Sequence, residues 1–284
     1  MRAGRMQPAA VLEDRALESS PMLADDLIEI HARPREIARF SERYPGLTPA
    51  DGYSAASLLH RHRLKNGWCA LGRKIGFTNR TIWPRYGVYE PIWGTVYDRT
   101  LAYAKNDAAE VSLEGLIQPR IEPEICFRLK TPPPPRADPQ SLLGCIEWIA
   151  HSIEIVQCHH PDWKLTLADA TADNGLHGRL VIGTPLAVSQ VPDLSAALPK
   201  LKVILEKNRI AVDQGIGENV LGSPLLALAY FVEVLAQQPD APPLRAGEIV
   251  TTGTLTDAHP VAAGESWSTK LSGLPLPGLT VRFT

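Results

Sequence analysis

The 284-residue sequence has few cysteines, no long apolar run and no excess of charge of either sign. Its four cysteines form no C-x-x-C pair and no repeated spacing, so neither a zinc site nor a disulfide framework is indicated, and a reducing cytoplasm is expected. No segment approaches the roughly 18 consecutive apolar residues that a transmembrane helix needs, and residues 1–20 lack the apolar core of a secretory signal. We therefore expect a protein that is neither exported by that route nor inserted in a membrane.

The balance of charge argues against nucleic acid and anionic membranes as partners. There are 29 basic and 31 acidic residues, and a net charge of -2 provides no electrostatic footprint for nucleic acid or an anionic membrane surface. Small molecules are the expected partners. A chain of this length can bury a large core, and it is long for one domain but short for two large ones, so one main domain with a smaller one is expected.

Two helices are predicted near the N-terminus. The first begins at Pro21, after which leucine and isoleucine recur at helical spacing. The second lies between a capping candidate at Thr48 and a stop at Gly67. We expect residues 1–21 to form a flexible extension and residues 22–90 to form a helical N-terminal region.

The remaining residues, 91–284, are predicted to form a β-rich domain. A hairpin is indicated around Lys207 and Asn208. One helix interrupts the strands, with Ser223 as its N-cap and Pro224 in its first turn. Because the helical and strand segments do not alternate regularly, the pattern favours an α+β fold over a doubly wound sheet.

One segment of this domain, "PRIEPEICFRL" at residues 119–129, combines a strand pattern with two acids and a proline. In a strand, Glu122 and Glu124 share a face, roughly 6 to 7 Å apart, while Ile121 lies on the other face. Two anions so close repel each other unless a cation or water lies between them. Pro123 is expected where the ladder opens to a cavity, since proline is confined to edges, strand starts or bulges. A solvated edge strand with protective charges is the alternative.

A third acid stands out in "AHSIEIVQC", where Glu154 is the one acid of an otherwise apolar strand. If Glu122, Glu124 and Glu154 converge, they form an all-oxygen site that suits Mg²⁺ or Mn²⁺ rather than zinc or copper. The alternative is an ion pair between Glu154 and a buried arginine or lysine.

Several segments, taken in order, resemble one family. They are "GRKIGFTNR", "EPIWGTVYD", "QPRIEPEICF", "IEIVQCHHPDWKLTLADATADN" and "AGEIVTTGTL". Over residues 22–283 the chain resembles the 2-keto-4-pentenoate hydratase and 2-oxo-3-hexenedioate decarboxylase group of the fumarylacetoacetate hydrolase superfamily. The resemblance implies a small helical N-terminal region, a β-rich C-terminal catalytic domain of the superfamily's fold, and a homo-oligomer. It also implies a divalent metal, at positions that match Glu122, Glu124 and Glu154.

The resemblance further implies a 2-oxo acid substrate, chelated by the metal through its carboxylate and 2-oxo oxygen, and enolate chemistry. Lys74 matches the lysine of the family's K-I-G segment, where its cation would lie near the substrate and could move a proton if burial lowers its pKa; a surface lysine is the alternative. Further matching segments place five residues near the pocket: Asp173, Asn174, Thr252, Gly253 and Thr254. A turn at Asn174 and a plain strand end at Gly253 are the alternatives.

The chain also departs from the family pattern. Ile92 stands where the hydratases carry an acid that could handle the attacking water, whereas the decarboxylases tend to have an apolar residue. Residues 157–159 read Q-C-H where the family often has D-S-R, and Leu176 with His177 replaces small hydroxylic residues. These departures leave open the shape of the substrate and the roles of three histidines: His159, His160 and His177.

The function expected from these observations is hydration of a 2-hydroxy-2,4-dienoate to a 4-hydroxy-2-oxo acid in aromatic-compound degradation. The alternative is decarboxylation of 2-oxo-3-hexenedioate (4-oxalocrotonate), which Ile92 favours. An acylpyruvate hydrolase would need a base for water on the N-terminal region, where three histidines stand: His31, His60 and His62. A non-catalytic homologue is the last alternative, and the retained acids and Lys74 argue against it.

Overall fold

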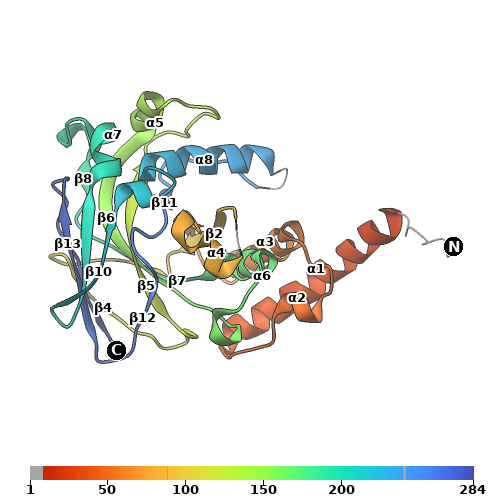
Figure 1. Cartoon of the computed structure of the whole chain (residues 1–284). Helices are drawn as coiled ribbons and strands as arrows, with labels where there is room; N and C mark the ends of the chain where they lie inside the picture. The colour runs from red at the N-terminus through yellow and green to blue at the C-terminus, as the bar shows by residue number, and fades with distance from the viewer. Residues whose placement is uncertain (1–8, 88, 239–240) are drawn as a thin grey trace.

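The computed structural model of the chain describes residues 9–87, 89–238 and 241–284 (Figure 1). The α-helices are α1 (Ala9–Ala32), α2 (Phe40–Arg43), α3 (Pro49–Lys65), α4 (Trp83–Tyr86), α5 (Pro139–Cys145), α6 (Leu167–Ala172), α7 (Leu194–Ala197) and α8 (Pro224–Gln237). The strands are β1 (Ala70–Gly76), β2 (Ile92–Tyr97), β3 (Leu101–Tyr103), β4 (Ala108–Val111), β5 (Arg120–Leu129), β6 (Ile146–Val156), β7 (His177–Ile182), β8 (Leu186–Ala187), β9 (Lys202–Lys207), β10 (Ile210–Ile216), β11 (Ile249–Thr251), β12 (His259–Pro260), β13 (Ser266–Ser272) and β14 (Thr280–Phe283).

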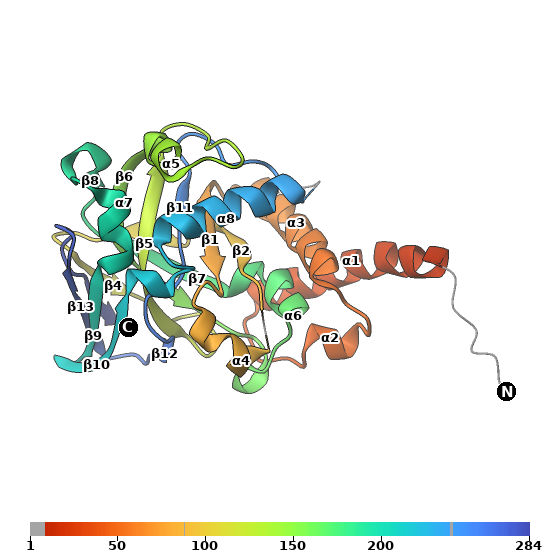
Figure 2. The same cartoon turned by 45° about the horizontal axis from the view of Figure 1, so that its top comes forward.

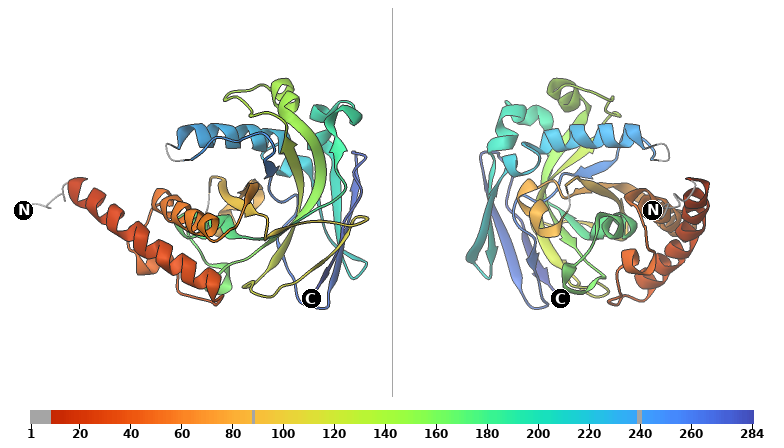
Figure 3. Two further views of the ribbon diagram at one scale, coloured as in Figure 1. Left: turned by 180° about the vertical axis from the view of Figure 1, so that it is seen from behind. Right: turned by 45° about the vertical axis from the view of Figure 1, so that its right-hand side comes forward.

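The strands form two sheets, which confirms the predicted α+β class. The larger, nine-stranded sheet has the order β2-β1-β11-β5-β6-β7-β3, with β12 paired to β5 and β8 paired to β6. The smaller sheet has the order β10-β9-β13-β14-β4. Seen from opposite sides, Figures 1 and 3 place helices α1 to α3 on one side of the molecule and the smaller sheet on the other. The larger sheet therefore lies between the N-terminal helices and the smaller sheet.

The N-terminal helix begins earlier than predicted. Helix α1 starts at Ala9 and contains Pro21 in its interior, so the start expected at Pro21 is wrong. Residues 1–8 of the expected extension lie outside the described residues. The predicted apolar face of this helix is buried with α2 and α3, in a cluster that includes Leu23, Leu27 and Phe40. This packing fixes the N-terminal helices to one another.

Helix α3 begins and ends where the sequence predicts. The Thr48 side chain accepts from the Asp51 N–H, and the Asp51 carboxylate accepts from the Thr48 N–H, which is a capping box. Strand β1, however, lies within residues 22–90 and pairs with β2 and β11, so this region is not purely helical. The residue range expected to be helical thus contributes a strand to the larger sheet.

Two predicted C-terminal elements are confirmed. Strands β9 and β10 form a hairpin whose turn contains Asn208 and Arg209 at positive φ. Helix α8 has Ser223 at its N-cap and Pro224 in the first turn. Its apolar face packs in the main core with residues such as Phe127 of β5, and Figure 2 shows the helix lying across the larger sheet.

The sequence predicts neither disulfide bonds nor membrane-spanning helices. The four cysteines are all free, as expected from their spacing. Among the helices of the described residues, none combines the length and the apolar character needed to cross a bilayer.

Candidate active site

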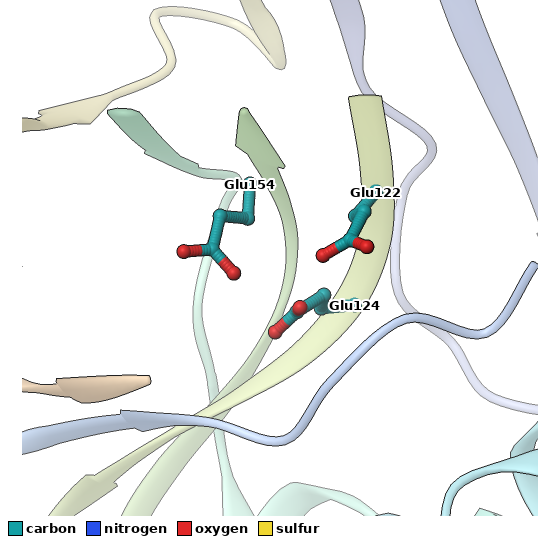
Figure 4. Close-up of side chains that lie close together, drawn as sticks. All are labelled: Glu122, Glu124 and Glu154. Carbon is teal, nitrogen blue, oxygen red and sulfur yellow. The ribbon is translucent and has the colours of Figure 1, made fainter. Parts of the chain in front are cut away.

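The three predicted acids meet between two neighbouring strands. Glu122 and Glu124 lie on one face of β5, and Glu122 is directly opposite Glu154 of β6. Figure 4 shows the three carboxylates turned toward one another, and each offers an oxygen within 4.8 Å of the others. Glu124 and Glu154 are fully buried, whereas Glu122 is partly exposed. The strand register therefore assembles the cluster that the sequence predicted.

Pro123 lies where β5 lacks a regular neighbour on one side. Strand β12 pairs with β5 as far as Ile121, and β11 pairs with it from Cys126 onward. Between them the Pro123 carbonyl accepts from the Leu255 N–H at 2.8 Å, so the proline nitrogen also faces this irregular segment. The missing N–H of Pro123 therefore removes no hydrogen bond between paired strands, because on this side no strand pairs with β5 at that point. The strand is interior rather than an edge, but the ladder is interrupted at the proline, as predicted.

The electrostatics of the cluster fit a divalent cation. Burial raises the pKa of Glu122 to about 7, with Lys74 opposing the shift and Glu154 adding to it. Burial and repulsion from Glu154 and Glu122 raise the pKa of Glu124 well above its usual value. One oxygen of Glu124, Oε1, is buried without a hydrogen-bond partner among the described residues. An all-oxygen set with surplus negative charge is suited to Mg²⁺ or Mn²⁺.

Lys74 of β1 is buried beside the acids and not on the surface. Its Nζ lies 3.2 Å from Glu154 Oε2 and donates to the Gly175 carbonyl at 2.9 Å. Burial acts to lower the Lys74 pKa, but the surrounding carboxylates, Glu154 above all, raise it above its usual value. A lowered pKa, the condition for proton transfer suggested by the sequence, is not met while three carboxylates surround the amine. The Lys74–Glu154 pair also confirms that Glu154 has a buried cationic neighbour.

The second neighbour of Glu154 is His177, whose role the sequence left open. Its Nδ1 lies 2.7 Å from Glu154 Oε1, and its Nε2 lies 2.8 Å from the Thr100 hydroxyl. Burial lowers the pKa of His177. Burial acts to raise the Glu154 pKa, but Lys74 and His177 bring it below its usual value. His177 donates from Nδ1 to the carboxylate, and the contact of its Nε2 with the Thr100 hydroxyl fixes the ring, which holds Glu154 in one orientation.

A glycine-containing loop after β11 holds Glu124. The Gly253 N–H donates to Glu124 Oε2 at 3.0 Å, and its φ is +96°. A Cβ at this position would lie 1.8 Å from the Thr78 hydroxyl oxygen, which itself donates to the Thr252 carbonyl at 2.9 Å. Only glycine allows this close approach.

The chain is similar in sequence to known hydratases and decarboxylases. No protein-family model matches the chain. The chain is 31% identical over 249 residues to the 2-hydroxyhexa-2,4-dienoate hydratase of Comamonas testosteroni, covering 87% of this chain and 92% of that protein. It is 29% identical over 262 residues to the 4-oxalocrotonate decarboxylase of Pseudomonas sp. (strain CF600), covering 92% and 94%.

Solved structures of related enzymes have a similar fold. The 4-oxalocrotonate decarboxylase from Pseudomonas putida G7, complexed with magnesium and adipate, has a TM-score of 0.84 at 26% identity, covering 99% of this chain and 100% of that chain. The fumarylpyruvate hydrolase from Pseudomonas aeruginosa shares the fold at a TM-score of 0.55 and 14% identity. The chain belongs to the 2-keto-4-pentenoate hydratase and 2-oxo-3-hexenedioate decarboxylase group of the fumarylacetoacetate hydrolase superfamily. It is an enzyme of the lyase class.

Two residues that the family pattern places near the pocket make other contacts here. The Asp173 carboxylate is buried 2.7 Å from His159 Nδ1 and 2.9 Å from His31 Nε2, which connects it to α1. The side chain of Asn174 pairs with the backbone of Thr95 in β2. A direct role of Asp173 and Asn174 toward substrate stays a prediction. Their contacts position Gly175, whose carbonyl holds Lys74.

A cavity adjoins the acids and Lys74. Among the family-predicted pocket residues, Ile92 and Thr254 line it, whereas Thr252 is buried and does not, its hydroxyl donating to the Ile125 carbonyl. Two of the three histidines with open roles, His159 and His160, are fully buried and are absent from the cavity wall. The positions of these side chains depend on contacts between residues distant in sequence, so no local sequence pattern predicts which of them line the cavity.

Proposed function

We propose that this enzyme hydrates a 2-hydroxy-2,4-dienoate to a 4-hydroxy-2-oxo acid, with Mg²⁺ or Mn²⁺ held by Glu122, Glu124 and Glu154. The observation that supports it is the convergence of three carboxylates and Lys74 beside a cavity that Lys74 and Glu122 line. When bound, the ion would supply Lewis acidity to the 2-oxo acid head of the substrate. The same arrangement suits any reaction in which negative charge develops on the 2-oxo oxygen.

Lys74 would stabilise that charge. One of its N–H groups is committed to the Gly175 carbonyl and its charge is balanced by Glu154, so its ammonium is held rigidly at the cavity wall. A positioned cation in a buried site stabilises a developing oxyanion without reorganising. Lys74 would therefore bind the substrate head and stabilise the negative charge that develops on its 2-oxo oxygen.

Water would be oriented at the cavity's Thr254. The Thr254 hydroxyl donates to the Thr256 carbonyl at 3.0 Å, so its oxygen can only accept a further hydrogen. A water that donates to Thr254 directs a lone pair away from it, toward the substrate. In this proposal the residue orients the nucleophile, and the electron-withdrawing 2-oxo acid head makes C4 of the substrate receptive to it.

Decarboxylation of 4-oxalocrotonate is the second candidate, favoured by the apolar Ile92 at the cavity wall and by the likeness to the decarboxylase from Pseudomonas putida G7. Carbon–carbon hydrolysis is less well supported, because two of the histidines that it could use are engaged: His31 contacts Asp173, and His60 Nδ1 lies 2.9 Å from the Tyr97 hydroxyl.

One panel tests these activities. The protein with Mg²⁺ is mixed with 2-hydroxypenta-2,4-dienoate, 2-oxo-3-hexenedioate and an acylpyruvate, while absorbance and CO₂ release are followed in parallel. Hydration of the dienoate is the expected result. Release of CO₂ from the hexenedioate without any hydration of the dienoate would replace the hydratase by a decarboxylase. A homo-oligomer, also part of this proposal, is measured by size-exclusion chromatography with light scattering.

A further inference from the structure

The turn that holds Lys74 has a strained backbone. Asn174, Gly175 and Leu176 have φ values of +50°, +63° and +65°, so three consecutive residues lie in the left-handed region. Glycine adopts this region freely and asparagine tolerates it, but a leucine adopts it only at a cost in free energy. A strained turn persists where the surrounding structure holds it. The groups that hold this 174–176 turn are therefore candidates for a role in the site.

The 174–176 turn forms part of the cavity wall and sets the position of the Lys74 amine. Gly175 and Leu176 line the cavity, and the Gly175 carbonyl accepts from Lys74 Nζ at 2.9 Å. The amine stands on a flexible stem, so the groups that it contacts decide where it lies. Its other contact is Glu154 Oε2 at 3.2 Å, so a displaced Gly175 carbonyl would leave the amine to the carboxylates.

Strand β2 holds the middle of the turn. The Asn174 side chain accepts from the Thr95 N–H at 2.8 Å and donates to the Thr95 carbonyl at 3.0 Å. The two backbones also approach closely, since a Cβ at Gly94 would lie 2.0 Å from the Asn174 carbonyl oxygen. These contacts fix the turn from Asn174 onward, and they leave its entry at Asp173 to other groups.

Two histidines hold the entry of the turn. Asp173 is 1% exposed, and its carboxylate lies 2.7 Å from His159 Nδ1 and 2.9 Å from His31 Nε2. Burial acts to raise the pKa of Asp173, but His159 and His31 bring it below its usual value, so the carboxylate is ionised at neutral pH. A buried carboxylate is costly without partners, so the two histidines fix where Asp173 can lie. None of the three is among the described residues that line the cavity.

We propose that His31 and His159 are positioning residues for catalysis: through Asp173 they hold the 174–176 turn, and the turn places the Lys74 ammonium. The inference rests on the proposed function for the role of Lys74, and it holds for either lyase reaction. It gives Asp173 a supporting role in place of contact with substrate. It also makes helix α1, which carries His31, part of the apparatus that determines kcat.

The alternative is that the two histidines only stabilise the fold. In that case their loss lowers the free energy of unfolding, and any loss of kcat is independent of Lys74. A double-mutant cycle separates the two cases, because residues that act through one another do not have additive effects. The variants are therefore compared in the wild-type and Lys74→Met backgrounds.

His31→Leu and His159→Leu remove the groups that contact Asp173. Each should lower kcat by roughly tenfold, because displacement of a catalytic group by about 1 Å can cost about 10²-fold. In the Lys74→Met background, each should lower kcat by less than about twofold further. Metal affinity, measured by calorimetry, should stay near that of the wild type, because the histidines contact Asp173 and not the three acids. Equal losses in the two backgrounds, or a wild-type kcat in folded leucine variants, would overturn the proposal.

Conservative variants test the same contacts with less risk to folding. His31→Gln and His159→Asn place an amide N–H near the former Nε2 and Nδ1, and should recover most of the lost kcat. Asp173→Asn has the same shape without the charge and should lower kcat only when Lys74 is present. A loss in Asp173→Asn that is the same with and without Lys74 would overturn the proposal.

Ser41→Ala is the matched control. The Ser41 hydroxyl donates to the Asp169 carboxylate at 2.9 Å, a contact that joins the N-terminal region to α6 without involving Asp173 or the turn. This variant should keep a wild-type kcat. A loss equal to that of His31→Leu would mean that any loosening of the N-terminal helices slows the enzyme, and would overturn a specific role for the histidine.

A second readout does not depend on activity. The Leu176 N–H donates to the Asp173 carbonyl at 2.9 Å, and the Gln157 N–H donates to the Leu176 carbonyl at 2.9 Å. Hydrogen exchange of the metal-loaded protein should be faster at these two amides in the leucine variants than in the wild type and Ser41→Ala. Unchanged exchange in both leucine variants would overturn the proposal whatever the kinetics.

Failure of this proposal and failure of the proposed function give different results. The kcat is measured with whichever compound of the panel the wild type turns over, so a decarboxylase serves the test as well as a hydratase. If Lys74→Met is slow but the histidine variants keep a wild-type kcat, the positioning proposal alone fails. If Lys74→Met itself keeps a wild-type kcat, the role of Lys74 fails, and the positioning proposal fails with it.

Discussion

Glu154 Oε1 and His177 Nδ1 lie 2.7 Å apart in a fully buried contact, while Lys74 neighbours the other oxygen of the same carboxylate. The histidine ring is fixed at its far side by the Thr100 hydroxyl. Groups that orient a ligand carboxylate in this way commonly affect metal affinity as strongly as they affect turnover.

Replacement of His177 should therefore weaken metal binding. His177→Leu removes the donor and should lower Mg²⁺ or Mn²⁺ affinity by about 10- to 100-fold. His177→Asn places an amide N–H near the former Nδ1 and should restore most of that loss. Calorimetric metal titration of both variants is the measurement, with thermal unfolding to confirm that both fold. Equal affinities in His177→Leu and the wild type would show that this contact does not orient Glu154 for a metal.

Metal removal should abolish turnover. EDTA should inactivate the enzyme, and Mg²⁺ or Mn²⁺ should restore it. Glu124→Gln keeps the side-chain shape but removes the charge from a position 0% exposed, so metal affinity should fall without unfolding. Full activity in metal-free protein would remove the metal from the proposal, and an unchanged titration in Glu124→Gln would reassign this residue to the fold.

Lys74→Met should lower kcat by roughly 10²-fold or more, the usual scale for loss of a positioned acid or charge stabiliser. Metal affinity should remain near that of the wild type, because Lys74 contacts one carboxylate and is not a ligand. Lys105→Met, which removes an exposed lysine, is the control for charge alone. Steady-state kinetics and a metal titration are run on both, and a wild-type kcat in Lys74→Met would exclude Lys74 from catalysis.

Ile92→Asp should raise hydration relative to any decarboxylation and leave metal binding intact, because an acid at the cavity wall can orient or deprotonate water. Ile92→Asn is the matched variant that has similar size but cannot take a proton at neutral pH. Parallel measurement of absorbance and CO₂ release separates the two reactions. The same product ratio in the wild type and Ile92→Asp would mean that the residue at this position does not govern the choice.

Acid should destabilise the fold through His151, which lies between Glu124's carbonyl and the Thr269 hydroxyl. Burial lowers the pKa of His151 from 6.5 to about 4, so between these values the unfolded chain binds more protons. The free energy of unfolding should therefore fall as pH drops from 6.5 to 4, by up to about 3 kcal/mol from this group. Denaturant unfolding of His151→Gln should show less pH dependence, and the exposed His62→Gln should behave as the wild type.

Local chemistry made much of this protein predictable from its sequence. The alternation of residues 119–129 places the acids on one face because a strand has a period of two, and β5 follows that pattern. Helix α3 begins directly after Thr48 because the Thr48 side chain accepts from the Asp51 N–H, one of the free N–H groups of the first turn. The pairing of Glu122 with Glu154 then needed one further fact, the register between β5 and β6.

Tertiary structure decided the features that join distant parts of the chain. Pro21 signals a helix start, yet α1 continues through it, and the apolar face that follows the proline is buried in the packed N-terminal helices. The Gly253 N–H reaches Glu124 from 129 residues away, and His177 reaches Glu154 from 23. The sequence by itself determined which carboxylates could share a strand face, because side-chain direction is a local property. Which groups surround those carboxylates was decided only when the sheet register and the packing of the loops brought them together.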